Sequence, residues 1–239
     1  MLFRSTGPIV LIIAMLACSL LGVTIEKLAY KPLRYRPKLT ILITAIGISL
    51  FLEFGGQLVF GPDPKSFPTL MPSTLLIDSN NLILSSTPVI VIATAVLLMV
   101  ILRFIVMRTK IGTAMRAVSF NQQAASLMGI NINTVISFTF ILGSSLAAAG
   151  GILYGSLYPS INPLMGVFPG LKAFISAVLG GIGNIPGAAL GGFIIGLIET
   201  FVTGYLSPTF RDAIAFGILI LILLFKPAGL LGRNEAEKV

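Results

Sequence analysis

Residues 87–106, TPVIVIATAVLLMVILRFIV, decide the fold class, because Arg103 is their one charged residue. The hydrocarbon core of a bilayer is about 30 Å thick, and about 20 helical residues cross it. Comparable apolar runs lie at 8–25, 39–60, 134–156, 168–183, 187–205 and 211–226. We therefore predict an all-α integral membrane protein, a polytopic helix bundle of about seven transmembrane helices.

The composition supports this class and excludes others. The chain has 239 residues, of which 56% are hydrophobic and 10% charged, whereas charged residues make up about 25% of an ordinary soluble domain. It has no His and one Cys, Cys18, so disulfide, zinc and His-based acid–base chemistry are excluded. The sequence also lacks a phosphate-binding G-x-x-x-x-G-K-[ST] loop. We expect no catalytic residue, metal or cofactor here, and any ATP hydrolysis on another subunit.

The positions of the basic residues predict the orientation of the chain. Twelve of the 16 Lys and Arg residues fall in, or within a few residues of, the connections after the first and third runs and the segment after the last run. Loops rich in Lys and Arg stay in the cytoplasm. The N-terminus is therefore expected outside and the C-terminus inside. The net charge of +8 is interpreted as a topology signal, and no nucleic-acid partner is expected.

A cytoplasmic segment is predicted at about 108–133, between the third and fourth runs. Residues 112–129 are expected to form one short helix with Met115, Val118, Ala125 and Met128 along a single apolar stripe. Gly129 is expected to end this helix in the left-handed conformation. From the residues alone, the helix either lies against lipid headgroups or docks into a partner protein.

Ionisable residues within apolar runs are candidates for a transport pathway, because burying a charge in hydrocarbon is costly. Glu53, Lys172 and Glu199 are such residues, and Glu199 is the strongest candidate. Asn184 is a fourth, polar candidate. For each residue a purely structural role stays open, and one of the two acids is expected to be able to pair with Lys172.

Small residues gather near 180–191, where a hairpin or hinge is expected. The candidates for hinge or packing positions are Gly180, Gly181, Gly183, Pro186, Gly187 and Gly191. Close helix packing without any transport role is the alternative explanation.

Several stretches resemble one transporter family. They are EKLAYKPLR at 26–34, LITAIGIS at 42–49, TKIGTAMRA at 109–117, LMGIN at 127–131, AVLGGIGNIPGA at 177–188 and KPAGLLGR at 226–233. These sequences resemble the permease subunits of branched-chain amino acid ABC transporters of the LivH type. The resemblance extends over nearly the whole chain from about residue 20.

The resemblance implies a single permease domain over residues 1–239 in an ATP-driven importer of Leu, Ile and Val. The implied partners are a second, homologous or identical permease, two cytoplasmic ATPases and an external substrate-binding protein, in the lipid bilayer of the bacterial or archaeal plasma membrane. Residues 123–129, QAASLMG, are similar to the importer E-A-A-x-x-x-G loop, with Gln in place of Glu. The residues implied to couple to the ATPase are Arg116, Gln123, Ala124, Ala125, Met128 and Gly129.

The family resemblance implies further N-terminal helices, so a misplaced start, a truncated gene or a short variant is expected.

Two alternative functions remain at this stage. An ion-coupled secondary transporter would need no ATPase but would carry acidic residues at the midplane. An importer of another small solute, such as urea, would share the same architecture.

Overall fold

The computed structural model describes residues 7–34, 36–68, 75–79, 82–226 and 229–232. Helix contacts divide the chain into two compact units, Met1–Leu164 and Met165–Val239, and each unit is considered by itself. The expectation of a single domain over residues 1–239 stays a prediction. Arg233 and Lys238, which contributed to the predicted orientation, lie outside the described residues.

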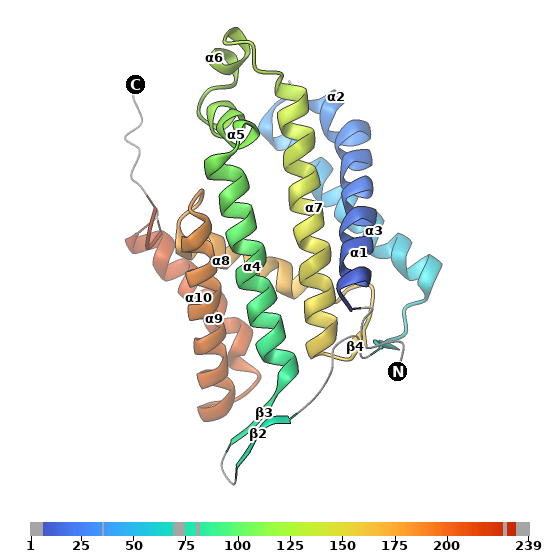
Figure 1. The fold of residues 1–239 in the computed structure, drawn as a ribbon, viewed down its shortest axis with the longest axis vertical. Helices are drawn as coiled ribbons and strands as arrows, with labels where there is room; N and C mark the ends of the chain where they lie inside the picture. Colours follow the sequence, from blue (N-terminus) through green and yellow to red (C-terminus); the bar gives the residue numbers. More distant parts are fainter. Residues whose placement is uncertain (1–6, 35, 69–74, 80–81, 227–228, 233–239) are drawn as a thin grey trace. The chain divides into compact units, whose positions relative to one another are not determined.

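The first unit is mainly helical (Figure 1). Its helices are α1 (Gly7–Ile25), the π-helix η2 (Glu26–Tyr30), α2 (Lys31–Leu33), α3 (Lys38–Phe60), α4 (Ser86–Arg108), α5 (Lys110–Phe120), α6 (Gln122–Leu127) and α7 (Ile132–Leu157). Two short antiparallel strand pairs, absent from the sequence prediction, join β1 (Lys65–Ser66) to β4 (Ser160–Ile161) and β2 (Leu75–Ser79) to β3 (Leu82–Ser85).

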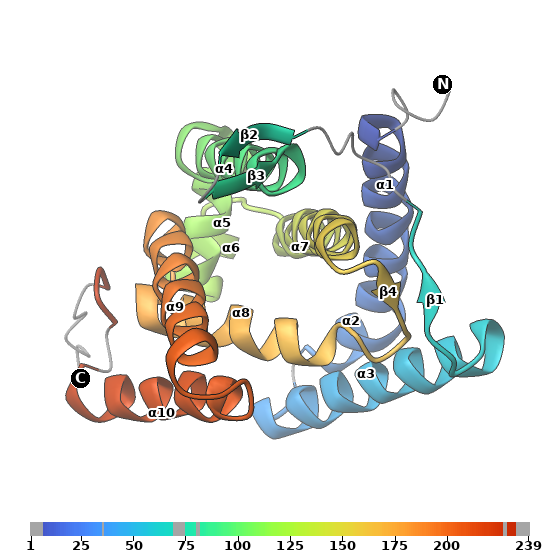
Figure 2. The ribbon, with the colours of Figure 1, turned by 90° about the horizontal axis from the view of Figure 1, so that it is seen from below.

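The second unit contains three helices that pack against one another (Figure 2). They are α8 (Val167–Gly180), α9 (Ile185–Tyr205) and α10 (Phe210–Phe225). Ile175, Leu179, Ile195 and Ala215 form their buried core.

The helices support a multi-pass membrane protein, but the predicted number of seven spans is not confirmed. Each predicted run contains a helix close to its predicted bounds. Among the described residues, five segments are long and apolar enough to cross a bilayer: Gly7–Leu33, Leu39–Phe60, Ser86–Arg108, Ile132–Leu157 and Ile185–Tyr205. Helix α8 has 14 residues and α10 has 16. At about 1.5 Å per residue, both are shorter than a hydrocarbon core of about 30 Å.

Helix α1 packs along α7 in the first unit, and the two lie side by side in Figure 1 and Figure 2. Gly22 faces Ser144, and a Cβ at Gly22 would overlap the Ser144 hydroxyl. The hydroxyl of Ser19, one turn earlier, donates to the carbonyl of Ile141 at 3.4 Å. A small residue at the crossing thus lets the two helices approach closely.

Glycines create the corresponding close approach in the second unit. A Cβ at Gly180 would overlap the carbonyl of Gly187, and a Cβ at Gly191 would overlap the carbonyl of Ser176. Helices α8 and α9 therefore touch backbone to backbone. Helix α8 ends at Gly180 rather than at 183 because Gly181, at φ 102°, leaves the helical conformation.

Candidate functional site

The segment between α4 and α7 begins with a tight junction. The Thr109 hydroxyl caps α5 by accepting from the Gly112 amide at 3.1 Å. A Cβ at Gly112 would overlap the carbonyls of Ile105 and Val106, so glycine is required there. Arg116 donates to the Val106 carbonyl and thereby braces the end of α4. The direction in which α5 leaves α4 is fixed by these contacts.

The prediction of one helix over 112–129 is wrong, because the helix breaks at Asn121. This residue has extended backbone angles, φ −155° and ψ 110°. Its side chain accepts from the Ala124 amide at 3.0 Å and so begins the separate helix α6.

The predicted end of this segment is confirmed. Gly129 has φ 81°, its amide donates to Ser126, and the Ile130 amide donates to the Ala125 carbonyl at 3.1 Å. These two bonds form a Schellman motif, which closes α6 and requires a residue in the left-handed conformation.

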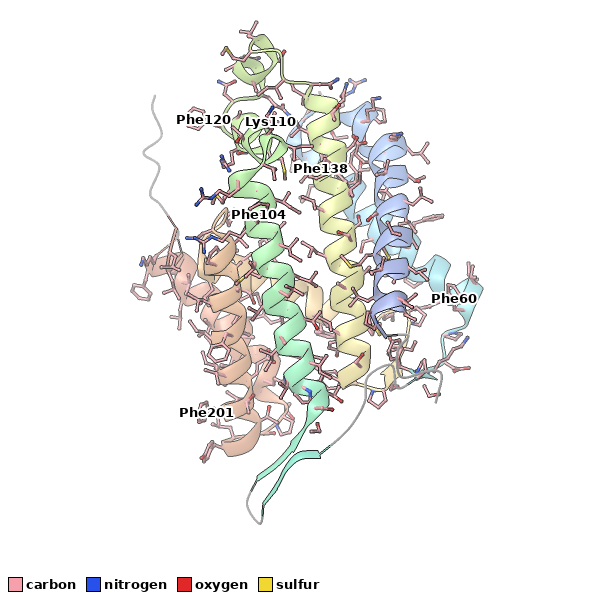
Figure 3. All side chains as sticks on the ribbon, in the orientation of Figure 1. Phe60, Phe104, Lys110, Phe120, Phe138 and Phe201 are labelled. Carbon is pink, nitrogen blue, oxygen red and sulfur yellow. The ribbon has the colours of Figure 1, made fainter. Side chains whose placement is uncertain are left out.

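The predicted single apolar stripe is wrong, because the break at Asn121 rotates α6 relative to α5. Ala125 is buried, whereas Met128 is 84% exposed. Phe120 and Leu127 are also 84% and 88% exposed, and Figure 3 labels Phe120 at the end of α5. We call these three exposed residues, Phe120, Leu127 and Met128, the α5–α6 patch.

Four charged side chains form a chain of ion pairs in the second unit. The Glu199 carboxylate accepts from Arg211 Nε at 2.8 Å and faces Lys172 Nζ at 2.9 Å. Lys172 also meets Asp212 at 2.8 Å. This cluster joins α8, α9 and α10, and its two positive and two negative charges balance. The interior members Lys172 and Glu199 are mostly buried, whereas Arg211 and Asp212 are nearly half exposed.

A second buried carboxylate lies in the first unit. Glu26 is 1% exposed and pairs with Arg34 Nη2 at 2.7 Å. Its other oxygen accepts from the Ser137 hydroxyl at 2.8 Å. Arg34 also donates to the side chain of Asn133. This network joins the start of η2, directly after α1, and the end of α2 to the first turns of α7.

The sequence profile described as "Branched-chain amino acid transport system / permease component" matches residues 1–223. The chain belongs to this family. The permease is 41% identical over 229 residues to BraD of Pseudomonas aeruginosa, a high-affinity branched-chain amino acid transport system permease protein. The matched region covers 95% of this chain and 75% of BraD. LivH of Escherichia coli K12, which has the same description, is 41% identical over 95% of this chain and 74% of its own length.

More distant relatives have other described substrates. XylH of Escherichia coli K12, a xylose transport system permease protein, is 28% identical over 56% of this chain and 37% of XylH. No solved structure matches the permease. The family resemblance inferred from the sequence is thus confirmed.

Two of the predicted pathway residues contact each other, and the other two make local contacts or contacts within a turn. Glu199 and Lys172 form an ion pair, as the sequence analysis held possible. Glu53 accepts a hydrogen bond from Ser49 on its own helix at 2.8 Å. Asn184 caps α9 by accepting from the Gly187 amide at 3.0 Å, and its NH₂ group donates to the Leu231 carbonyl at 3.0 Å. Both described contacts of Asn184 therefore serve the turn between α8 and α9.

The candidate hinge or packing residues fall into two groups. Gly180, Gly187 and Gly191 lie at the close approach of α8 and α9, where Pro186 occupies the first turn of α9. Gly181 and Gly183 have positive φ, at 102° and 91°. These positions need glycine for packing or for backbone conformation, and their role as a moving hinge stays a prediction.

Sequence reasoning missed Glu26, Arg211 and Asp212. Each lies at one end of an apolar run, whereas the candidate pathway residues were chosen among ionisable residues further inside such runs. The sequence signal for Glu26 is its place directly after the run, on the face that Ser19 and Gly22 also occupy, because positions three and seven residues apart share a helix face.

Proposed function

We propose that this chain is the permease subunit of an ATP-driven importer of Leu, Ile and Val. The observation that carries the proposal is the 41% identity to BraD and LivH over 95% of the chain. The permease provides the translocation pathway by alternating access, in which two conformations open to opposite sides of the membrane.

The proposed complex contains a second permease, two cytoplasmic ATPases and an external substrate-binding protein. ATP and Mg²⁺ are bound by the ATPases, and this chain holds no cofactor. The complex lies in the plasma membrane of a bacterium or archaeon, with no nucleic-acid partner. The family description as a component of a transport system supports these assignments.

The α5–α6 patch is proposed to contact the ATPase. Three large apolar side chains that are each more than four-fifths exposed favour a binding surface, because such patches are rarely left uncovered. The capped ends at Asn121 and Gly129 hold α6 rigidly, so motion of a docked partner is passed on to α7. Arg116, Gln123, Ala124 and Ala125 then shape the segment, and Ala125 does so from the buried side.

The coupling role is tested by replacing Leu127 with Asp. This exposed change should lower ATPase binding to the permease in detergent by about tenfold or more, because a contact residue central to an interface can contribute 2 kcal/mol or above. Ser126→Asp, on the neighbouring exposed position, is the matched control for added charge. Equal loss in both variants would oppose specific docking of the patch.

Glu199 and Lys172 are proposed to line the substrate pathway, with Glu53 as a further candidate. One oxygen of Glu199, Oε1, lies 2.9 Å from Lys172 Nζ, and a carboxylate oxygen with two lone pairs can accept from a second donor such as an ammonium group. A branched-chain amino acid presents an ammonium, a carboxylate and an apolar side chain, and the cluster offers both signs of charge beside apolar helices.

The deciding experiment is uptake of labelled leucine into proteoliposomes that contain the permease with its ATPases and binding protein. We expect ATP-dependent uptake that unlabelled isoleucine and valine inhibit. Uptake of urea or xylose instead would assign another solute to the same architecture. Uptake without ATP, driven by an ion gradient, would indicate a secondary transporter.

A further inference from the structure

Glu26 is a fully buried carboxylate, and the packing of α1 against α7 does not by itself need a charged residue at this position. It is 1% exposed and uses both carboxylate oxygens, one toward Arg34 at 2.7 Å and the other toward Ser137 at 2.8 Å. Replacing a buried ion pair with apolar residues is often neutral or stabilising. A pair of this kind is therefore better explained by the defined geometry that it imposes than by stability.

The local backbone supports a special role. Glu26 begins the π-helix η2, which interrupts the otherwise continuous helix from α1 to α2. Single π-helical turns occur frequently at functional sites. On the face before this turn, Ser19 and Gly22 already contact α7, and at its last residue Tyr30 lies against Phe140, with ring centroids 5.1 Å apart and ring planes tilted by 49°. The π-turn thus keeps one face of the chain against α7.

Arg34 extends this contact to the beginning of α7. It donates to Asn133, the second residue of that helix. Helix α7 begins at Ile132, directly after the Schellman turn at Gly129 and Ile130. This turn ends the segment of α5 and α6, which we call the coupling segment because it is proposed to contact the ATPase. Motion of α6 is therefore delivered first to the turn of α7 that Arg34 holds.

We propose that Glu26 and Arg34 are positioning residues for energy coupling: they clamp α1 to the first turns of α7, so that both helices move together when the coupling segment moves. This inference rests on the proposed function. Without the clamp, α6 and the start of α7 can shift while α1 remains behind. ATP would then be hydrolysed without a complete change in the transport pathway.

The test is the amount of ATP hydrolysed per leucine transported by the complete reconstituted complex. Glu26→Gln keeps the shape and the contact with Ser137 but removes the charge that holds Arg34. We expect the ratio to rise by about two- to thirtyfold, the range of coupling changes produced by single positions. A residue with only a structural role would lower the amount of complex and leave the ratio unchanged.

A second variant protects the test against misfolding of the first. Asn133 is exposed, so Asn133→Ala should fold normally, remove the contact of Arg34 with α7 and raise the ratio in the same direction. Thr134→Ala, exposed in the same turn, is the control and should leave the ratio at the unmodified value. An unchanged ratio in Asn133→Ala, whether or not Glu26→Gln assembles, would overturn the clamp. An unmodified complex that transports no leucine would instead overturn the proposed function.

Discussion

The two buried carboxylates, Glu26 in the first unit and Glu199 in the second, have their negative charges compensated by different sets of partners. Glu26 has one cation, Arg34, and a hydroxyl from Ser137. Glu199 has two cations, Lys172 and Arg211, and Lys172 has a second acid in Asp212. The network around Glu26 is closed, whereas the chain around Glu199 ends in two half-exposed side chains.

This difference separates charges that fix geometry from charges that can exchange partners. Removing one member of the Glu26 network leaves a mostly buried arginine with no described carboxylate. Removing one member of the Glu199 cluster leaves each remaining charge near another partner or near water. We expect the first unit to tolerate charge changes poorly and the second to tolerate them in graded steps.

Glu26→Ala should cause the largest loss of stability. Arg34 would lose its carboxylate, and breaking a buried pair by removing one partner costs about 3–5 kcal/mol. Thermal unfolding of the purified permease in detergent measures the loss. Glu53→Ala is the matched control, since Glu53 has a hydroxyl partner on its own helix, and it should unfold near the unmodified temperature. Similar losses of stability in both variants would mean that the buried Glu26 network is no more sensitive to the loss of a charge than Glu53 is.

Glycine contacts, rather than charges, should dominate the stability of the second unit. Gly191→Ala would force α9 away from the Ser176 carbonyl, and overpacking of this kind costs about 1–3 kcal/mol. Gly196→Ala adds the same methyl group where nothing lies within 4 Å and should be neutral or slightly stabilising. Unfolding temperatures of the two variants provide the comparison, and a neutral Gly191→Ala would show that the helices separate easily.

Glu199→Gln should affect transport more than stability. Lys172 keeps Asp212 at 2.8 Å, so we expect a loss of about 1 kcal/mol, typical of a single hydrogen-bonded contact. The apparent affinity for leucine should fall by several-fold if Glu199 receives the substrate ammonium. Unchanged affinity and rate, measured in the uptake assay, would make Glu199 a packing residue.

Asp212→Asn should have the smallest effect. Its side chain is 46% exposed, and exposed ion pairs contribute about 0–1 kcal/mol. Unfolding should be nearly unchanged, and raising the salt concentration should lessen any remaining difference. A loss as large as that of Glu26→Ala would mean that the cluster is as closed as the first network.

Much of the fold follows from local sequence, and the failures have physical causes. The apolar runs predict the helices because about 20 uncharged residues suffice for a span, and Gly129 predicts a helix end because its conformation is left-handed. The break at Asn121 was missed because an Asn is compatible with both a helix interior and a cap. Only the bond that its side chain accepts from the Ala124 amide shows that it acts as a cap here.

The candidate site was predictable only in part. The charge of Glu199 in the middle of an apolar run is visible in the sequence, and so is the nearby Lys172. The burial of Glu26 is not, because it arises from the packing of α1 against α7, more than 100 residues away, as the bond between Glu26 and Ser137 shows. The pathway role of Asn184 stays a prediction, and its contact with Leu231, which lies 47 residues further along the chain, is not visible in the local sequence.

The segment Gly229–Leu231 has a consequence for the order of assembly during synthesis. The amides of Leu230 and Leu231 donate to the last carbonyls of α8, at Leu179 and Gly180, with distances of 2.7 and 3.1 Å. A nascent chain that has just released α8 and α9 into the bilayer lacks these donors. The turn between the two helices is therefore completed only after α10 has been made, and a ribosome that stalls within α10 leaves the end of α8 without these two bonds.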